Sequence, residues 1–197
     1  AATADVARTP RTKARRVIIQ TNRPQRTISF LKENDYRYKM SIQHHLQVVL
    51  VEPEIPPNTG AIARLCAATK TRLHLIEPFG FQLDDRQLKR AVRVDGQHGE
   101  WQRWKNWTEF VAGQPVDARF WFIESDGPKH YAEVQYQTDD YLVFGRETAG
   151  LPKQLIEENR ARWLRLPMFP AASRSLNLSN CAALVLFEAL RQQGFTG

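Results

Sequence analysis

The sequence predicts an α/β fold with a mainly parallel sheet flanked by helices, and two observations carry this prediction. Short apolar runs, which are typical of buried strands, alternate along the chain with segments whose apolar residues have helical spacing. The first run, LQVVLVE at residues 46–52, is continuously apolar at its centre, as expected of a strand covered on both faces. No apolar run approaches the roughly 18 to 20 residues of a membrane span, so we expect no membrane segment.

Five strands are predicted from runs rich in β-branched, aromatic and other apolar residues. In chain order they cover residues 46–52, 72–77, 118–124, 141–145 and 162–168. The helices predicted between and after them cover residues 61–70, 84–92, 106–113, 153–161 and 178–193. Residues 53–60, with three prolines, and the polar, glycine-rich residues 93–101 are predicted to be loops, and a helix could start at Asn58.

The positive charge of the chain is concentrated at its N-terminal end. Residues 1–39 contain ten Lys or Arg and three acidic side chains, which accounts for the whole formal net charge of +7. Because this segment has little apolar periodicity, we predict a basic, disordered N-terminal arm over residues 1–39 and a single domain over residues 40–197. Three interpretations of the arm stay open: a solvated tail upstream of a start at Met40, an arm that binds RNA by counterion release, or a transit peptide.

Composition and spacing argue against several kinds of site. The two cysteines, Cys66 and Cys181, lie within apolar helical patterns, so reduced core residues and a cytoplasmic location are expected. No group of His, Cys, Asp and Glu has the spacing of metal ligands, so no metal is predicted. The sequence also lacks the glycine-rich motifs of dinucleotide and P-loop sites and the serine elbow of hydrolases.

Three polar loops are expected to form a binding site. The segments 53–60, 145–152 and 168–180 each follow a predicted strand, and the carboxyl ends of parallel strands lie at one edge of a sheet. Gly145 is expected to let a ligand approach the backbone at the end of its strand. Glu147, on the same loop, could serve the site, or it could cap a neighbouring helix or pair with an arginine.

The same loops carry a resemblance to a known family. The segments EPEIPPNTGAIARLCA, FGRETAGLP and LPM with SRSLNLSN occur in this order and resemble the three motifs of the SPOUT, or α/β-knotted, RNA methyltransferases. The resemblance covers residues 46–194. It is greatest to the small subfamily that 2′-O-methylates the wobble nucleotide of tRNA, cytidine or uridine 34.

The resemblance implies a fold, a cofactor and partners. The fold would contain a deep trefoil knot in its C-terminal part, an exception to the rule that chains are unknotted. The methyl donor would be S-adenosylmethionine, the substrate the anticodon stem-loop of tRNA, and the active form a homodimer. Two alternatives stay open: a ribose methyltransferase of this family that acts on another RNA, such as rRNA, and an RNA-binding dimer without catalysis.

Site residues are implied by the same motifs, position by position. Arg64 matches the catalytic arginine. Because its guanidinium stays protonated, we expect it to orient the RNA and stabilise negative charge rather than to act as a base. The residues implied to bind the cofactor are Ile123, Gly145, Leu166, Ser175 and Leu176. Those expected to shape the site or contact RNA are Asn58, Glu147, Arg174 and Asn177.

The sequence also departs from the pattern of this family. Arg146 stands where the family often has proline, and Glu124 and Asp126 stand where lysine or threonine is usual. Phe187 replaces a tyrosine expected in the final helix. We expect these differences to affect the choice of RNA more than the fold or the cofactor.

Overall fold

The computed structural model describes residues 45–82, 93–94, 97–98, 100–168 and 176–195. The predicted N-terminal arm and the charged helix predicted for residues 84–92 lie outside the described residues, so both stay predictions. The implied trefoil knot also stays a prediction, because the segment after the last strand includes residues 169–175, which lie outside them as well.

Seven strands form one sheet, and the predicted α/β class is confirmed. The strand order is β5-β2-β1-β8-β6-β9-β7, and every neighbouring pair runs parallel. The strands are β1 (Gln47–Val51), β2 (Arg72–Ile76), β5 (Trp101–Trp104), β6 (Phe120–Glu124), β7 (Lys129–His130), β8 (Tyr141–Phe144) and β9 (Trp163–Arg165). A separate antiparallel pair consists of β3 (Arg93–Val94) and β4 (Gln97–His98).

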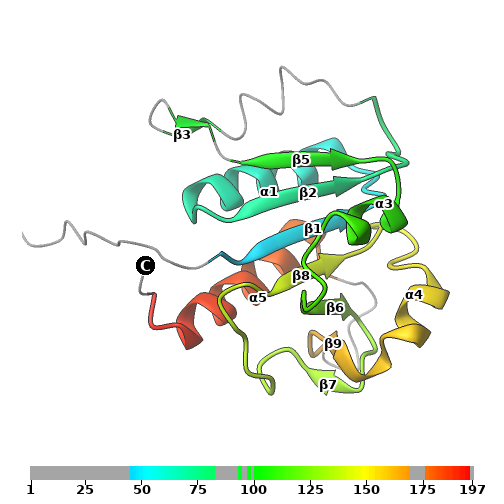
Figure 1. Cartoon of the computed structure of the whole chain (residues 1–197), viewed down its shortest axis with the longest axis vertical. Coiled ribbons are helices and arrows are strands. Elements are labelled where there is room, and N and C mark those ends of the chain that lie inside the picture. The colour runs from blue at the N-terminus through cyan, green and yellow to red at the C-terminus, as the bar shows by residue number, and fades with distance from the viewer. Residues whose placement is uncertain (1–44, 83–92, 95–96, 99, 169–175, 196–197) are drawn as a thin grey trace, which may run out of the picture. The chain divides into compact units, whose positions relative to one another are not determined.

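Helices cover both faces of the sheet (Figure 1). In β1, Val48 and Leu50 pack into a core shared with α1 and α5, whereas Val49 and Val51 pack into a core shared with α3 and α4. Successive side chains of a strand point to opposite faces, so an uninterrupted apolar run is what burial on both faces requires. The helices are α1 (Pro56–Ala68), α3 (Trp107–Ala112), α4 (Lys153–Glu158) and α5 (Leu178–Gln192), with a 3₁₀ turn at Arg160–Arg162.

Four short strands were not predicted. The loop predicted for residues 93–101 is wrong in part, because it contains β3, β4 and the first residue of β5. β5 is an edge strand that pairs with β2, and the side chains of Trp101 and Trp104 are half-buried while the two between them are exposed. The short strand β7 was not predicted either. β5 and β7 form through pairing with a neighbour distant in sequence, which local apolar periodicity does not report.

Helix α1 begins earlier than predicted, at Pro56 instead of Asn58. Prolines occupy the first two helical positions, where a missing N–H costs nothing and the fixed φ angle suits the helix. The first helical N–H group that remains, on Asn58, donates to the carbonyl oxygen of Ile55 at 3.0 Å. The helix therefore starts immediately after the loop from β1, and its first turn lies at the carboxyl edge of the sheet.

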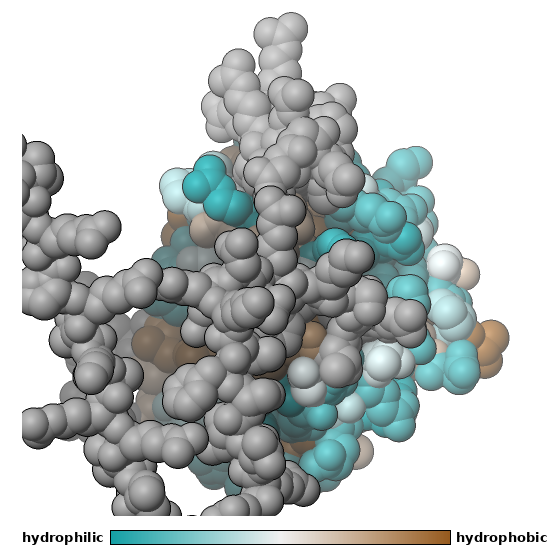
Figure 2. All heavy atoms as spheres, turned by 90° about the vertical axis from the view of Figure 1, so that its left-hand side faces the viewer, coloured by the Kyte–Doolittle hydropathy of each residue, from teal (hydrophilic) through white to brown (hydrophobic). Residues whose placement is uncertain are grey.

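The described surface is mainly hydrophilic on the face drawn in Figure 2, with smaller apolar areas between the polar ones. Large apolar side chains that are exposed among the described residues include Leu184 and Phe187 on α5. None of the described helices is long and apolar enough to cross a membrane.

Candidate active site

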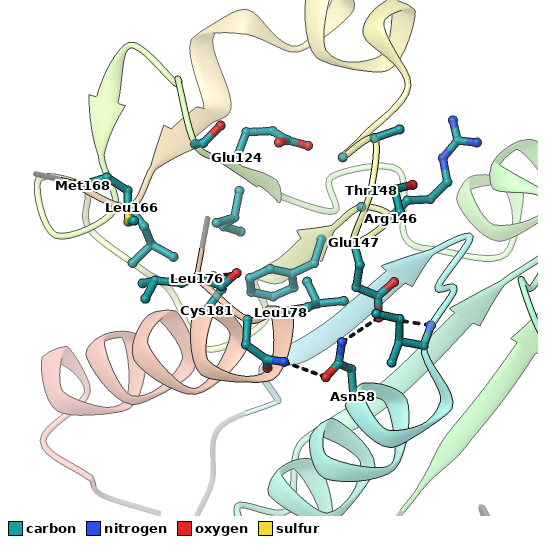
Figure 3. Close-up of a pocket in the computed structure, with 18 residues that line it drawn as sticks. Asn58, Glu124, Arg146, Glu147, Thr148, Leu166, Met168, Leu176, Leu178 and Cys181 are labelled. Carbon is teal, nitrogen blue, oxygen red and sulfur yellow. Dashed lines mark hydrogen bonds between the residues drawn. The ribbon is translucent and has the colours of Figure 1, made fainter. Parts of the chain in front are cut away.

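A cavity of about 450 Å³ lies at the carboxyl ends of β6, β8 and β9 (Figure 3). Its walls come from the end of β6, the turn after β8, the end of β9, the first turn of α1 and the start of α5. This volume is within the range of pockets that hold small organic ligands. The convergence predicted for the three polar loops is confirmed for their described residues, because each of the three loops contributes to the lining.

The turn after β8, residues 145–151, is a tight return of the chain. Arg146 and Gly150 exchange backbone hydrogen bonds of 3.1 and 3.0 Å, and Gly150 has a φ angle of 65°, which favours glycine. A Cβ atom on Gly145 would lie 2.2 Å from the carbonyl carbon of Gly150. Glycine is therefore required at position 145 because the backbone of Gly150 approaches it closely. The sequence had suggested a different reason, which was access of a ligand to the backbone.

The Glu147 carboxylate connects this turn to the first turn of α1. Its Oε2 accepts a hydrogen bond from the Glu54 N–H at 2.8 Å, and its Oε1 accepts one from the Asn58 side-chain amide at 2.9 Å. The Ile55 N–H donates to Oε1 at 3.3 Å. A negative charge is favourable at the N-terminal end of a helix, where N–H groups lack helical partners. These contacts agree with the interpretation of Glu147 as a cap for a neighbouring helix.

A reciprocal contact strengthens the same junction. The Glu54 carboxylate accepts hydrogen bonds from the Thr148 hydroxyl at 2.7 Å and from the Thr148 N–H at 3.1 Å. The hydroxyl bond is the main reason why the pKa of the Glu54 carboxyl lies below its usual value. Two adjacent residues of the turn are thus each bonded to the loop that precedes α1.

The hydrogen bonds continue from Asn58 to α5. The Asn177 amide donates to Asn58 Oδ1 at 2.8 Å, and Asn177 Oδ1 in turn accepts from the Ser179 N–H at 2.9 Å. Asn177 is the N-cap of α5, so the chain of bonds from Glu147 through Asn58 ends at a helix N-terminus. We call this set, Glu147, Asn58, Asn177 and Ser179, the loop relay. Figure 3 shows Glu147 bonded to Asn58 on one side of the cavity.

An apolar part of the lining faces the relay. It includes four of the five residues implied to bind the cofactor, and these are Ile123, Gly145, Leu166 and Leu176. Ile123 and Leu166 are buried at the ends of β6 and β9, which fixes their positions, while Leu176 is exposed. A flat aromatic ring system would fit against such a surface, with the backbone groups of the strand ends available as hydrogen-bond partners.

Of the other predicted residues, one lies away from the cavity and two lie outside the described residues. Arg64 does not line it: the residue is exposed on α1, six residues after Asn58 and thus about 9 Å further along the helix axis. Its guanidinium makes no ion pair or hydrogen bond with the described residues. Arg174 and Ser175 lie outside the part of the chain that the structure describes.

The structure adds lining residues beyond those assigned to the site from the sequence. Glu124, at the end of β6, has its carboxylate against the turn at Gly150. Leu178 and Cys181, on the first turn of α5, also line the cavity. Their spacing of three residues places them on one helix face, and with Asn177 as the N-cap this spacing could have identified them. Burial raises the pKa of the Cys181 thiol, so it stays protonated.

Comparison with known proteins identifies the family. A model of the SpoU rRNA Methylase family matches residues 45–187. The chain belongs to the SpoU rRNA methylase family. A relative from Saccharophagus degradans, named tRNA (cytidine(34)-2'-O)-methyltransferase, is 51% identical over 154 residues, which are 76% of this chain and 97% of the relative.

Two solved structures of RNA methyltransferases show the same fold as this SpoU methylase. One concerns the 2-OH methylation of C/U34 on tRNA; it is 38% identical, covers 77% of this chain and 97% of its own, and has a TM-score of 0.69. The other, an AdoMet-bound rRNA methyltransferase from Sinorhizobium meliloti, is 25% identical, covers 76% of this chain and 57% of its own, and has a TM-score of 0.64.

We predict that Asn58→Asp destabilises the protein. The carboxylate would face Glu147 without the amide protons that Asn58 now donates, and both groups are at least partly buried. Loss of such a buried bond, with like charges in its place, should lower the free energy of unfolding by about 1–3 kcal/mol. Urea denaturation measures this change. The matched control is Asn180→Asp, an exposed position at the start of α5, where a change within about 0.5 kcal/mol is expected. Equal effects of the two substitutions would contradict a structural role for the loop relay.

Proposed function

We propose that this chain is an S-adenosylmethionine-dependent RNA methyltransferase that 2′-O-methylates the ribose of the tRNA wobble nucleotide, cytidine or uridine 34. The observation that carries the proposal is the relative at 51% identity, which is named for this reaction and of which the chain covers 97%. The three loops that carry the family's motifs also meet at one cavity. The substrate would be the anticodon stem-loop, and the site of action the cytoplasm.

The cavity fits S-adenosylmethionine. Ile123, Leu166 and Leu176 offer an apolar wall for the adenine ring, and the Glu124 carboxylate offers a complement to a cationic ligand. We assign cofactor binding to Ile123, Gly145, Leu166, Ser175 and Leu176. When bound, S-adenosylmethionine would supply an electrophilic methyl group and leave as S-adenosylhomocysteine, and the ribose 2′-hydroxyl would lose its proton to a phosphate or a water as the new bond forms.

We assign the catalytic role to Arg64. An arginine is a poor base because its pKa is above about 12, but its guanidinium can bind a phosphate in a bidentate manner and stabilise negative charge on the ribose oxygen. Arg64 is exposed and makes no ion pair or hydrogen bond with the described residues, which suits a group that meets RNA. Asn58, Glu147 and Asn177 would shape the site through the loop relay, and Arg174 would contact RNA.

The active form would be a homodimer. Helix α5 packs beside α1 and exposes Leu184 and Phe187, whose side chains are 45% and 48% accessible, on a face that the described chain does not cover. The ring of Phe187 lies 6.4 Å from the exposed ring of Phe195, so the apolar surface continues past the end of the helix. Burial of this surface by a second copy would place two α1 helices, each with its Arg64, near one interface.

A second candidate substrate is ribosomal RNA. The family is described as rRNA methylases, and the solved structure from Sinorhizobium meliloti is that of an rRNA methyltransferase. Its identity to this chain, 25%, is half that of the relative from Saccharophagus degradans, which favours tRNA.

We predict that the protein transfers methyl groups from labelled S-adenosylmethionine to bulk tRNA, and that mass spectrometry maps a 2′-O-methyl group to nucleotide 34. Arg64→Ala should lower the rate by about 10²–10³ fold, the range for loss of one group that stabilises developing charge. Its affinity for S-adenosylmethionine should stay unchanged, because Arg64 does not line the cavity.

The matched control for Arg64→Ala is Arg72→Ala, which removes another exposed arginine at the opposite, amino end of β2. This control should retain the rate. A product on rRNA alone would favour the second candidate. Cofactor binding without transfer to either RNA would support the non-catalytic interpretation.

For the homodimer, we predict that Phe187→Asp converts a dimer into a monomer and abolishes methyl transfer. A charge in the middle of an apolar interface loses its hydration without gaining a partner. Analytical ultracentrifugation at micromolar concentration measures the mass. Val111→Asp, at an exposed apolar position of α3, is the control and should leave the dimer intact. A wild-type protein that sediments as a monomer would refute this part of the proposal.

A further inference from the structure

Glu124 places a carboxylate in the wall of the cavity, and the turn at Gly150 and Leu151 holds one side of this carboxylate. Its Oε1 accepts a hydrogen bond from the Leu151 N–H, and both carboxylate oxygens lie so close to Gly150 that a Cβ atom there would be within 2.6 Å of each. Glycine at position 150 is thus required by the carboxylate as well as by the turn. In Figure 3, Glu124 lies across the drawn cluster from Asn58, on the side opposite the loop relay.

The charge of this carboxylate is not balanced by the described lining. Arg146 is the one basic residue among the described residues that line the cavity, and its guanidinium forms an ion pair with Glu52 at 3.4 Å. Figure 3 shows the Arg146 side chain directed away from the cavity. Burial is the main cause of a raised pKa of the Glu124 carboxyl, and the nearby charge of Asp126 adds to it.

The other acid in the lining is already occupied. Glu147 has three hydrogen-bond donors, from Glu54, Ile55 and Asn58, which satisfy both of its oxygens. Glu124, by contrast, accepts a hydrogen bond from the Leu151 N–H and has no cationic partner among the described residues. Among the described lining residues, negative charge is therefore in excess at the Glu124 wall, and this charge favours a cationic ligand.

We propose that Glu124 shifts the binding preference of the cavity towards S-adenosylmethionine and away from the product, S-adenosylhomocysteine. The inference rests on the proposed function, since it takes these two molecules as the ligands. They share every group except the transferred methyl, but the sulfur is a sulfonium cation in the donor and a neutral thioether in the product. A carboxylate in the wall therefore attracts the donor by a Coulomb interaction that the product lacks.

The size of this interaction makes it measurable. For two unit charges in a partly buried site, the attraction extends over several ångströms, so no direct contact between carboxylate and sulfur is required. A tenfold change in the ratio of dissociation constants corresponds to about 1.4 kcal/mol, well within the energy available at such separations. In function, methyl transfer removes the attraction at the moment when the product has to leave, so Glu124 would favour exchange of product for fresh donor.

The test is isothermal titration calorimetry of both ligands with wild-type protein and Glu124→Gln. Glutamine keeps an oxygen that can accept the Leu151 N–H bond, so the turn is retained while the charge is removed. We expect the affinity for S-adenosylmethionine to fall by about tenfold and that for S-adenosylhomocysteine to change less than about twofold. Equal changes for the two ligands, or none for either, would overturn the proposal.

Two further variants separate charge from shape. Glu124→Asp keeps the charge but shortens the side chain. Both affinities should therefore fall, while the ratio of the two dissociation constants stays near that of the wild type. Loss of the wild-type ratio in this variant would contradict the proposal even if Glu124→Gln failed to fold. Asp126→Asn removes an exposed charge two residues away that does not line the cavity, and it should leave the ratio unchanged.

A wild-type protein that binds neither ligand would contradict the proposed function itself, whereas binding with an unaltered ratio in Glu124→Gln would contradict the role of Glu124 alone.

Discussion

The Glu147 carboxylate is the interaction on which the candidate site depends. It joins residues separated by about ninety positions in the chain, since its partners Glu54, Ile55 and Asn58 precede or begin α1. A carboxylate that accepts two backbone N–H groups and one amide at a helix N-terminus combines charge-assisted bonds with the favourable end of the helix dipole. Through Asn58 the same group fixes Asn177, and thereby the start of α5. Three loops from distant parts of the chain are thus joined at one site.

The parallel sheet brings these loops within reach of each other. β1, β8, β6 and β9 are neighbours, so the segments that follow them leave from the same edge. The apolar wall formed by Ile123 and Leu166 is part of the core at the strand ends, and the polar loop relay lies opposite. One cavity therefore combines a rigid apolar surface with a hydrogen-bonded polar one, a division that suits a nucleoside ligand.

The sequence was sufficient for the fold class, for the strands β1, β2, β6, β8 and β9, and for the convergence of three loops, because buried runs and strand-end polarity are local signals. It did not reveal the antiparallel pair β3 and β4, or β5 and β7, which form by pairing with distant neighbours. Nor did it give the reason for Gly145, because the clash that excludes a side chain comes from the returning chain at Gly150. The pairing of Glu147 with Asn58, and the place of Glu124 in the wall, depend on tertiary geometry in the same way. Arg64 was assigned from a motif alone; it lies outside the cavity lining, and its catalytic role stays a proposal.

The central claim is that the three loops are held together by the Glu147 carboxylate before any ligand binds. Amide hydrogen exchange of the ligand-free protein, followed by NMR, tests it most directly. The claim predicts slow exchange of the Glu54 N–H in the wild type and much faster exchange in Glu147→Ala, with the Leu50 N–H in the core of β1 unchanged. Fast exchange of the Glu54 N–H in the wild type, or equal rates in the two proteins, would show that the loops are not held in this way and would contradict the account.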